Sequence, residues 1–77
     1  MPTVLRLNGY RFGFFSADGD EPAHLHVSKA GAQAKFWLRP VALADNYGFR
    51  RHELREIETI LTEQQTILLQ AWHEYFG

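Results

Sequence analysis

The sequence contains no cysteine among its 77 residues, and this absence excludes both disulfide bridges and metal sites built from thiolates. Apolar runs are also short, because none approaches the roughly 18 residues that a membrane-spanning helix requires. The N-terminal residues lack the basic start and the long apolar middle of a secretory signal peptide. Together these absences predict a cytoplasmic protein that does not insert into a membrane.

A strong excess of one charge is lacking as well. The formal net charge of -1 argues against a general binder of polyanions, so any basic surface must be local. Hydrophobic residues make up 45% of the chain and aromatic residues 14%, which is enough material for a packed core. A chain of this length forms one small domain, and we expect it to span residues 1–77.

Alternation of apolar and polar side chains over residues 1–44 predicts an antiparallel β-meander of four or five strands. The expected strands are residues 4–7, 10–15, 24–28 and 33–39. Asn8-Gly9, between the first two, is typical of a hairpin turn. Residues 41–44 suit a fifth strand and a loop equally well, and residues 45–48 are expected to form a loop.

From Phe49 onward the hydrophobic period becomes that of an amphipathic helix, with an apolar stripe formed by Leu54, Ile57, Ile60 and Leu61. The segment 62–65 matches a capping box, so a second helix is expected to start there. Its apolar stripe is Ile67, Leu68, Ala71, Trp72, Tyr75 and Phe76. We therefore predict an α+β fold in which a helical pair, residues 49–76, packs on one face of the sheet. The strands offer that face in Tyr10, Phe12, Phe14, Phe36 and Leu38.

The stretch from Glu21 to Val27 carries the least common chemistry in the chain. Pro22 biases Glu21 toward an extended conformation, so the segment leaves a turn and enters a strand. Residues two apart in a strand share a face, and His24 and His26 therefore project together on the exposed side, opposite to the core. Two solvated histidines on a half-exposed strand would show the same pattern.

Several blocks of sequence taken together resemble the small bacterial family named domain of unknown function 4160. These blocks are residues 1–4, 9–12 with 15–16, 21–27, 34–38 and 72–77. Many relatives have a proline where this chain has Ala23. The resemblance implies a component of a toxin-antitoxin pair whose partner is a small protein encoded by a neighbouring gene. It carries over no catalytic residue.

The sharpest chemical hypothesis is cleavage of RNA by general acid-base catalysis. His24 and His26 would act as base and acid, since imidazole titrates near neutral pH. Lys35 or Arg11 would stabilise the charge on the phosphate if the strand register brings it to the same face. On this hypothesis the protein is the toxin of its pair.

Two alternatives stay open. A metal ion would bind the histidines with Glu21 or Asp20, but the remaining candidates, His73 and Glu74, lie on the last helix. We therefore predict no metal ligand, no structural zinc and no cofactor. The other alternative is a non-catalytic module, such as the neutralising antitoxin, that binds another protein. Homo-oligomerisation is left open. The candidate binding residues are Glu21, Trp37, Arg39, Arg50 and Arg51.

Overall fold

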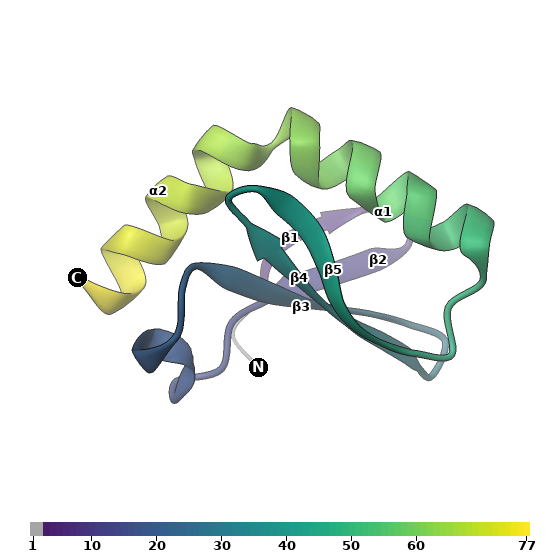
Figure 1. Ribbon diagram of the computed structural model, residues 1–77, viewed down its shortest axis with the longest axis horizontal. Coiled ribbons are helices and arrows are strands. Elements are labelled where there is room, and N and C mark those ends of the chain that lie inside the picture. The colour runs from purple at the N-terminus through teal and green to yellow at the C-terminus, as the bar shows by residue number, and fades with distance from the viewer. Residues whose placement is uncertain (1–2) are drawn as a thin grey trace.

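Five consecutive strands form one antiparallel sheet in the order β1-β2-β3-β4-β5, as the computed structural model shows (Figure 1). The structure describes residues 3–77, so Met1 and Pro2, which belong to the first block of the family resemblance, lie outside the described residues. The strands are β1 (Thr3–Leu7), β2 (Tyr10–Gly13), β3 (His24–Lys29), β4 (Ala32–Leu38) and β5 (Val41–Tyr47). The predicted meander is confirmed.

Two tight turns set the register of the meander. Asn8 and Gly9 have positive φ of 54° and 84°, and Ala30 and Gly31 have positive φ of 51° and 86°. Two successive residues with positive φ form the turn whose twist matches that of an antiparallel hairpin. The predicted turn at Asn8-Gly9 is therefore confirmed.

The last strand is longer than the sequence predicted. We expected a loop over residues 45–48, but Asp45, Asn46 and Tyr47 continue β5 and pair with the first half of β4. A register shift between Lys35 and Phe36 accommodates this extension. The prediction was wrong because polar residues weaken a strand pattern, whereas the unpaired backbone groups of β4 provide partners for them. Conversely, β2 ends at Gly13 and not at residue 15.

Two helices follow the sheet, α1 (Arg51–Glu63) and α2 (Gln65–Phe76). The break at Gln64 lies where the sequence placed it, but the predicted capping box does not form. The Thr62 hydroxyl instead donates to the carbonyl of Glu58, 2.8 Å away, one turn earlier in α1. At the start of α1, the Glu53 carboxylate accepts a hydrogen bond from the Arg50 amide at 2.9 Å.

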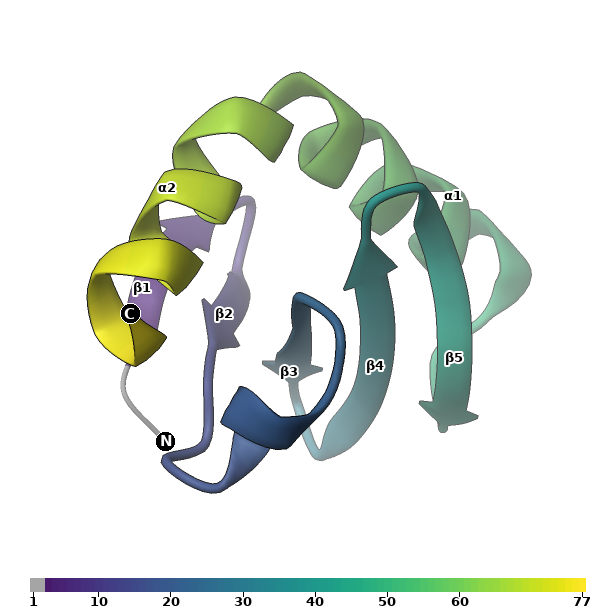
Figure 2. The same ribbon diagram turned by 60° about the vertical axis from the view of Figure 1, so that its left-hand side comes forward.

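The hydrophobic core lies between the helices and one face of the sheet (Figures 1 and 2). Buried residues of the strands include Tyr10, Phe12, Leu25, Val27, Phe36 and Leu38, and Phe14, directly after β2, is buried with them. Ile57, Ile60, Leu61, Leu68 and Trp72 are the buried residues of the helices. Two members of the predicted second stripe do not join them, because Ile67 is 64% exposed and Tyr75 46% exposed. Helix α2 thus contacts the sheet along a narrower stripe than its apolar residues suggest.

The opposite face of the sheet, called the open face below, carries no helix within residues 3–77 (Figure 1). A short 3-10 turn, η1 (Asp18–Asp20), lies in the connection from β2 to β3, beside the N-terminal end of β3 (Figure 2). Neither helix within the described part of the chain is long and apolar enough to cross a membrane.

Candidate functional site

The strand register brings three of the four predicted catalytic residues onto the open face. Gly13 pairs with His26 and Arg11 with Ser28, while His26 pairs in turn with Lys35 of β4. Residues directly opposite in neighbouring strands point to the same side of a sheet. Arg11, His26 and Lys35 therefore lie on one face, which the sequence alone did not determine.

His24 belongs to the same side of β3 but is fully buried, and our expectation of an exposed His24 was wrong. Its ring lies 5.6 Å from the Trp37 ring on the paired strand and 5.2 Å from the Trp72 ring of α2, between ring centroids. Alternation along a strand predicts which side a residue faces, but not that a distant helix reaches around to enclose it. His26 is 25% exposed, so of the two histidines of β3 it is the one open to solvent.

The turn before β3 supplies a carboxylate that the sequence did not single out as a site residue. The amide of Phe15 donates to Asp18 Oδ2 at 2.8 Å, and the amide of Asp18 donates to the Phe15 carbonyl at 3.0 Å. A Cβ at Gly19 would lie 2.9 Å from Cδ1 of Phe76, so glycine lets this turn approach the end of α2 closely. These contacts fix the Asp18 side chain above the first residues of β3.

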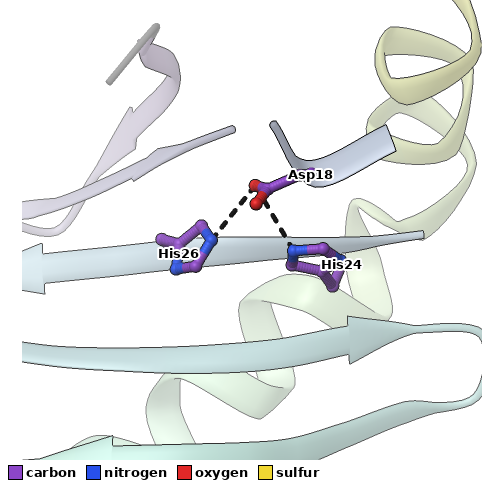
Figure 3. A group of neighbouring side chains, drawn as sticks. All are labelled: Asp18, His24 and His26. Atoms are coloured by element: carbon purple, nitrogen blue, oxygen red, sulfur yellow. Dashed lines mark hydrogen bonds and ion pairs between the residues drawn. The ribbon is translucent and has the colours of Figure 1, made fainter. Parts of the chain in front are cut away.

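Asp18, His24 and His26 form one cluster, called the triad below (Figure 3). Asp18 Oδ2 lies 3.1 Å from Nε2 of His26 and 3.3 Å from Nε2 of His24. One ligand atom from each of the three residues lies within 4.8 Å of the other two. The two imidazoles of β3 thus converge on a single carboxylate, which belongs to η1.

A backbone carbonyl fixes the orientation of His24. Its Nδ1–H donates to the carbonyl of Pro22 at 2.9 Å, because a carbonyl can only accept. Nε2 of His24 then points toward the Asp18 carboxylate. It is buried there and has no hydrogen-bond partner among the described residues. This arrangement, with the distal nitrogen tied to a carbonyl, is the one that orients histidine ligands in metal sites.

The charges within the triad shift two pKa values. Burial alone would raise the pKa of Asp18, but the hydrogen bond from Phe15 and the nearby imidazoles outweigh it and lower the pKa below its ordinary value. Burial lowers the pKa of His26, and the attraction of Asp18 only partly offsets this effect. Asp18 is therefore anionic at neutral pH, and His26 holds its proton less tightly than a free histidine.

A second carboxylate approaches the triad from the β3 side of the turn. Oε1 of Glu21 lies 3.7 Å from Nε2 of His24 and accepts a hydrogen bond from Lys35 Nζ at 2.9 Å. That hydrogen bond lowers the pKa of Glu21. Lys35 also lies over the Trp37 ring, 4.7 Å from its centroid. Lys35 is thus engaged with Glu21 and Trp37, which leaves Arg11 as the better candidate for binding a phosphate.

A small pocket of about 140 Å³ opens on the open face next to the triad. It is lined by Arg11, Phe15, His26, Val27, Ser28 and Gln33. Nε of Arg11 is buried there without a hydrogen-bond partner among the described residues. Phe15, 44% exposed, packs edge-on against His26 with ring centroids 4.4 Å apart. The pocket therefore joins a guanidinium, an imidazole and neutral hydrogen-bonding groups.

The remaining predicted residues lie elsewhere or only border the site. Trp37 is half-buried on the open face, opposite His24. Arg39 is exposed in the turn after β4, and Arg50 and Arg51 are exposed at the start of α1, in the helical layer on the other side of the sheet. The structure does not bring these three arginines to the triad. Asp20, His73 and Glu74, considered as metal ligands, are exposed and are not among its members.

The signal that pointed to Asp18 was present but incomplete. Because β2 and β3 are antiparallel neighbours, the loop between them must return to the start of β3, where the histidines lie. Any acid in that loop is therefore a candidate partner for them. Which of Asp18, Asp20 and Glu21 reaches the histidines depends on the turn geometry, which the sequence does not specify.

Comparison with known proteins gives one match. The model of a family described as Domain of unknown function (DUF4160) matches residues 9–73. The match includes the whole triad and the Arg11 pocket. No curated protein and no solved structure matches the chain.

Proposed function

The chain belongs to the DUF4160 family, and because that name assigns no activity, we propose from the site itself that the protein cleaves phosphodiester bonds of RNA at its open face. One observation carries the proposal: Arg11 and His26 line the same pocket, and His26 is half of the histidine pair held by Asp18. A cation beside a group that handles protons is what phosphoryl transfer requires.

Arg11 has the role of binding the phosphate. A guanidinium offers donors in a planar fork that matches two phosphate oxygens, and Nε of Arg11 is already buried without a partner in the described structure. Ser28 and Gln33, which also line the pocket, add neutral donors. At about 140 Å³ the pocket is smaller than the cavities that enclose small-molecule ligands, which suits contact with one group of a single-stranded polymer.

The triad has the role of activating the attacking oxygen. Asp18 is an anion backed by a backbone amide, and it orients the half-exposed His26 at the edge of the pocket. The attacking oxygen gives its proton to the free ring nitrogen of His26 and forms a bond to phosphorus, while the bond to the leaving oxygen breaks and that oxygen takes a proton from water. His24 is buried, so it acts through its contact with Asp18 and does not touch the RNA.

Aromatic rings extend the proposed binding surface. Phe15 borders the pocket beside His26, and Trp37 lies on the same face across from His24. Bases of single-stranded RNA stack on such rings with little dependence on sequence. RNA cleavage with little sequence preference would arrest growth, which fits the toxin of a two-protein pair whose partner is encoded by a neighbouring gene.

The proposal is tested by growth on induced expression, with and without the neighbouring gene, together with the integrity of cellular RNA. Arg11→Ala and His26→Asn are expected to remove most of the growth arrest. Arg51→Ala and His73→Asn, which change exposed residues of the same types on the helices, are matched controls that should arrest growth like the wild type. Arrest by a folded Arg11→Ala, His26→Asn double variant would contradict the proposal and favour a non-catalytic binding module.

A further inference from the structure

We propose that Asp18, His24 and His26 form a binding site for one divalent first-row transition-metal ion. The inference deepens the proposed function, because it names what activates the attacking oxygen. The inference is argued from the structure of the triad, and its test measures metal binding without RNA. A failure of metal binding can therefore be distinguished from a failure of RNA cleavage.

The distances between ligand atoms suit a shared ion. Two ligands bound at about 2.0–2.1 Å with angles between about 90° and 109° lie about 2.9–3.4 Å apart. The two separations from Asp18 Oδ2, 3.1 Å to His26 and 3.3 Å to His24, fall within that range. The third pair of ligand atoms, from the two histidines, lies within 4.8 Å. His26 is the less buried of the two rings, and a small rotation of it would bring this pair into the same range.

The protonation of His24 also calls for a cation. Since Nδ1 carries the proton given to Pro22, the neutral ring has a lone pair on Nε2. That lone pair faces carboxylate oxygens at 3.3 Å and 3.7 Å, from Asp18 and Glu21. Two acceptors repel unless a positive charge lies between them. A proton on Nε2 would be directed at Asp18, but this contact lacks hydrogen-bond geometry. A metal ion bound along the lone pair fits better.

The local charge favours a cation as well. Asp18 and Glu21 contribute two negative charges, and Lys35, paired with Glu21, offsets one of them. With neutral histidines, these three side chains leave one net negative charge beside the ligand atoms. Two imidazoles and a carboxylate are a ligand set of borderline softness, which selects zinc, iron or cobalt over magnesium or calcium.

The ligand count assigns the site to chemistry and not to folding. Three protein ligands leave at least one coordination position for water, whereas structural zinc sites are closed by four. Of the three ligands, His26 also lines the pocket that contains Arg11, so an open position on the solvent-exposed side of His26 would lie next to that pocket. A bound metal ion lowers the pKa of its water, which supplies the attacking oxygen next to the phosphate site. The sequence-based prediction of no structural zinc is compatible with such a site, whereas the prediction of no metal ligand is not.

The test uses the full chain, purified without a polyhistidine tag and treated with chelator. Cobalt(II) is the probe, because its visible absorption reports coordination by nitrogen and oxygen, and zinc(II) is titrated by calorimetry. We expect one equivalent of either ion per chain. Asp18→Asn, which keeps an acceptor for the Phe15 amide, and His26→Asn should each weaken binding at least tenfold, by analogy with losses of about 10- to 100-fold from outer-shell changes alone.

Asp20→Asn is the matched control, since it removes an exposed carboxylate from the same turn, and it should bind like the wild type. Circular dichroism confirms that each variant is folded. Absence of stoichiometric binding to the wild type would overturn the inference and leave a proton shared between Asp18 and His24. Binding that survives both Asp18→Asn and His26→Asn would also overturn it, because the ion would then be held elsewhere on the surface.

Discussion

At the residue scale, burial gives the two histidines different roles. His24 is fully enclosed and ties its Nδ1–H to Pro22, whereas His26 is 25% exposed at the edge of the pocket. A buried ring that fills space between Trp37 and Trp72 contributes to the stability of the fold. A half-exposed ring contributes less and is free to meet a ligand.

This difference predicts unequal effects of alanine substitution. His24→Ala should lower the free energy of unfolding by about 2–4 kcal/mol, because it leaves a cavity and removes the donor to the Pro22 carbonyl. His26→Ala should cost about 1 kcal/mol or less. Urea denaturation of the two variants measures both values. Equal stabilities of the two variants would show that His24 is not packed as described.

How far the sequence predicts the site is clearest in the same residues. Alternation along β3 correctly placed His24 and His26 on one side of the sheet. The strand register then brings Arg11 of β2 and Lys35 of β4 to that same side, which alternation within each strand could not predict. The burial of His24 was missed because Trp72, which encloses it, lies 48 residues along the chain in a separate helix. Contacts between distant segments leave no local pattern.

At the scale of elements, α2 serves both the core and the site. Its Trp72 packs edge-on against Phe14 of the core, with ring centroids 5.3 Å apart, and lies against His24 of the triad. Phe76, one turn later, contacts both Trp72 and the turn that holds Asp18. The last turns of α2 therefore support the wall of the site.

Substitution of Trp72 should accordingly be costly. Trp72→Ala is expected to lower the free energy of unfolding by about 3–5 kcal/mol through the loss of buried surface. Ile67→Ala, on the exposed side of the same helix, is the matched control and should change it by about 0.5 kcal/mol or less. Chemical denaturation compares the two. A denaturation midpoint unchanged by Trp72→Ala would contradict the packing of α2.

The same elements show what hydrophobic periodicity can and cannot predict. The change from a period of two to a helical period correctly separated sheet from helices, and the α1 stripe at Ile57, Ile60 and Leu61 is buried as expected. For α2 the pattern was ambiguous, because apolar residues occupy more of its circumference than the sheet covers. Ile67 and Tyr75 therefore remain exposed, and only the tertiary packing distinguishes them from Leu68.

At the scale of the whole molecule, two residues of the triad make the stability of the fold depend on pH. His26 has a pKa below its ordinary 6.5 and Asp18 a pKa below its ordinary 3.8. Both groups therefore bind a proton more readily in the unfolded chain, so protonation favours unfolding. Their contribution to stability is present above the unfolded pKa values and is lost as the pH falls through the folded ones.

We therefore expect the folded protein to lose stability as the pH falls below about 6.5, first through His26 and at lower pH through Asp18. Urea midpoints measured from about pH 8 to about pH 5, with chelator present, test the first step. His26→Asn should flatten this dependence, while His73→Asn, on the surface of α2, should not. A wild-type midpoint that rises on acidification over this range would contradict the assignment.

The arrangement of layers supports the proposal that the open face is the functional surface of this domain. Both helices lie on the other side of the sheet, together with the core (Figure 2). His26 and the pocket that it shares with Arg11 are therefore open to solvent on this side, whereas His24 is enclosed. Arg50 and Arg51, the basic pair of the sequence, lie at the start of α1 in the helical layer and are not members of the triad. Most of the core thus lies on one face of the sheet, and the proposed site lies on the other.

The most direct test of the open face is to map RNA binding residue by residue with amide NMR spectra of the labelled protein. A short single-stranded RNA with non-cleavable linkages should shift the amides of β2 to β4 that surround Arg11, His26 and Ser28. The amides of α1, including those near Arg51, should remain unchanged. Shifts confined to the helices, or none at RNA concentrations that saturate weak binders, would contradict the assignment of the open face as the RNA site.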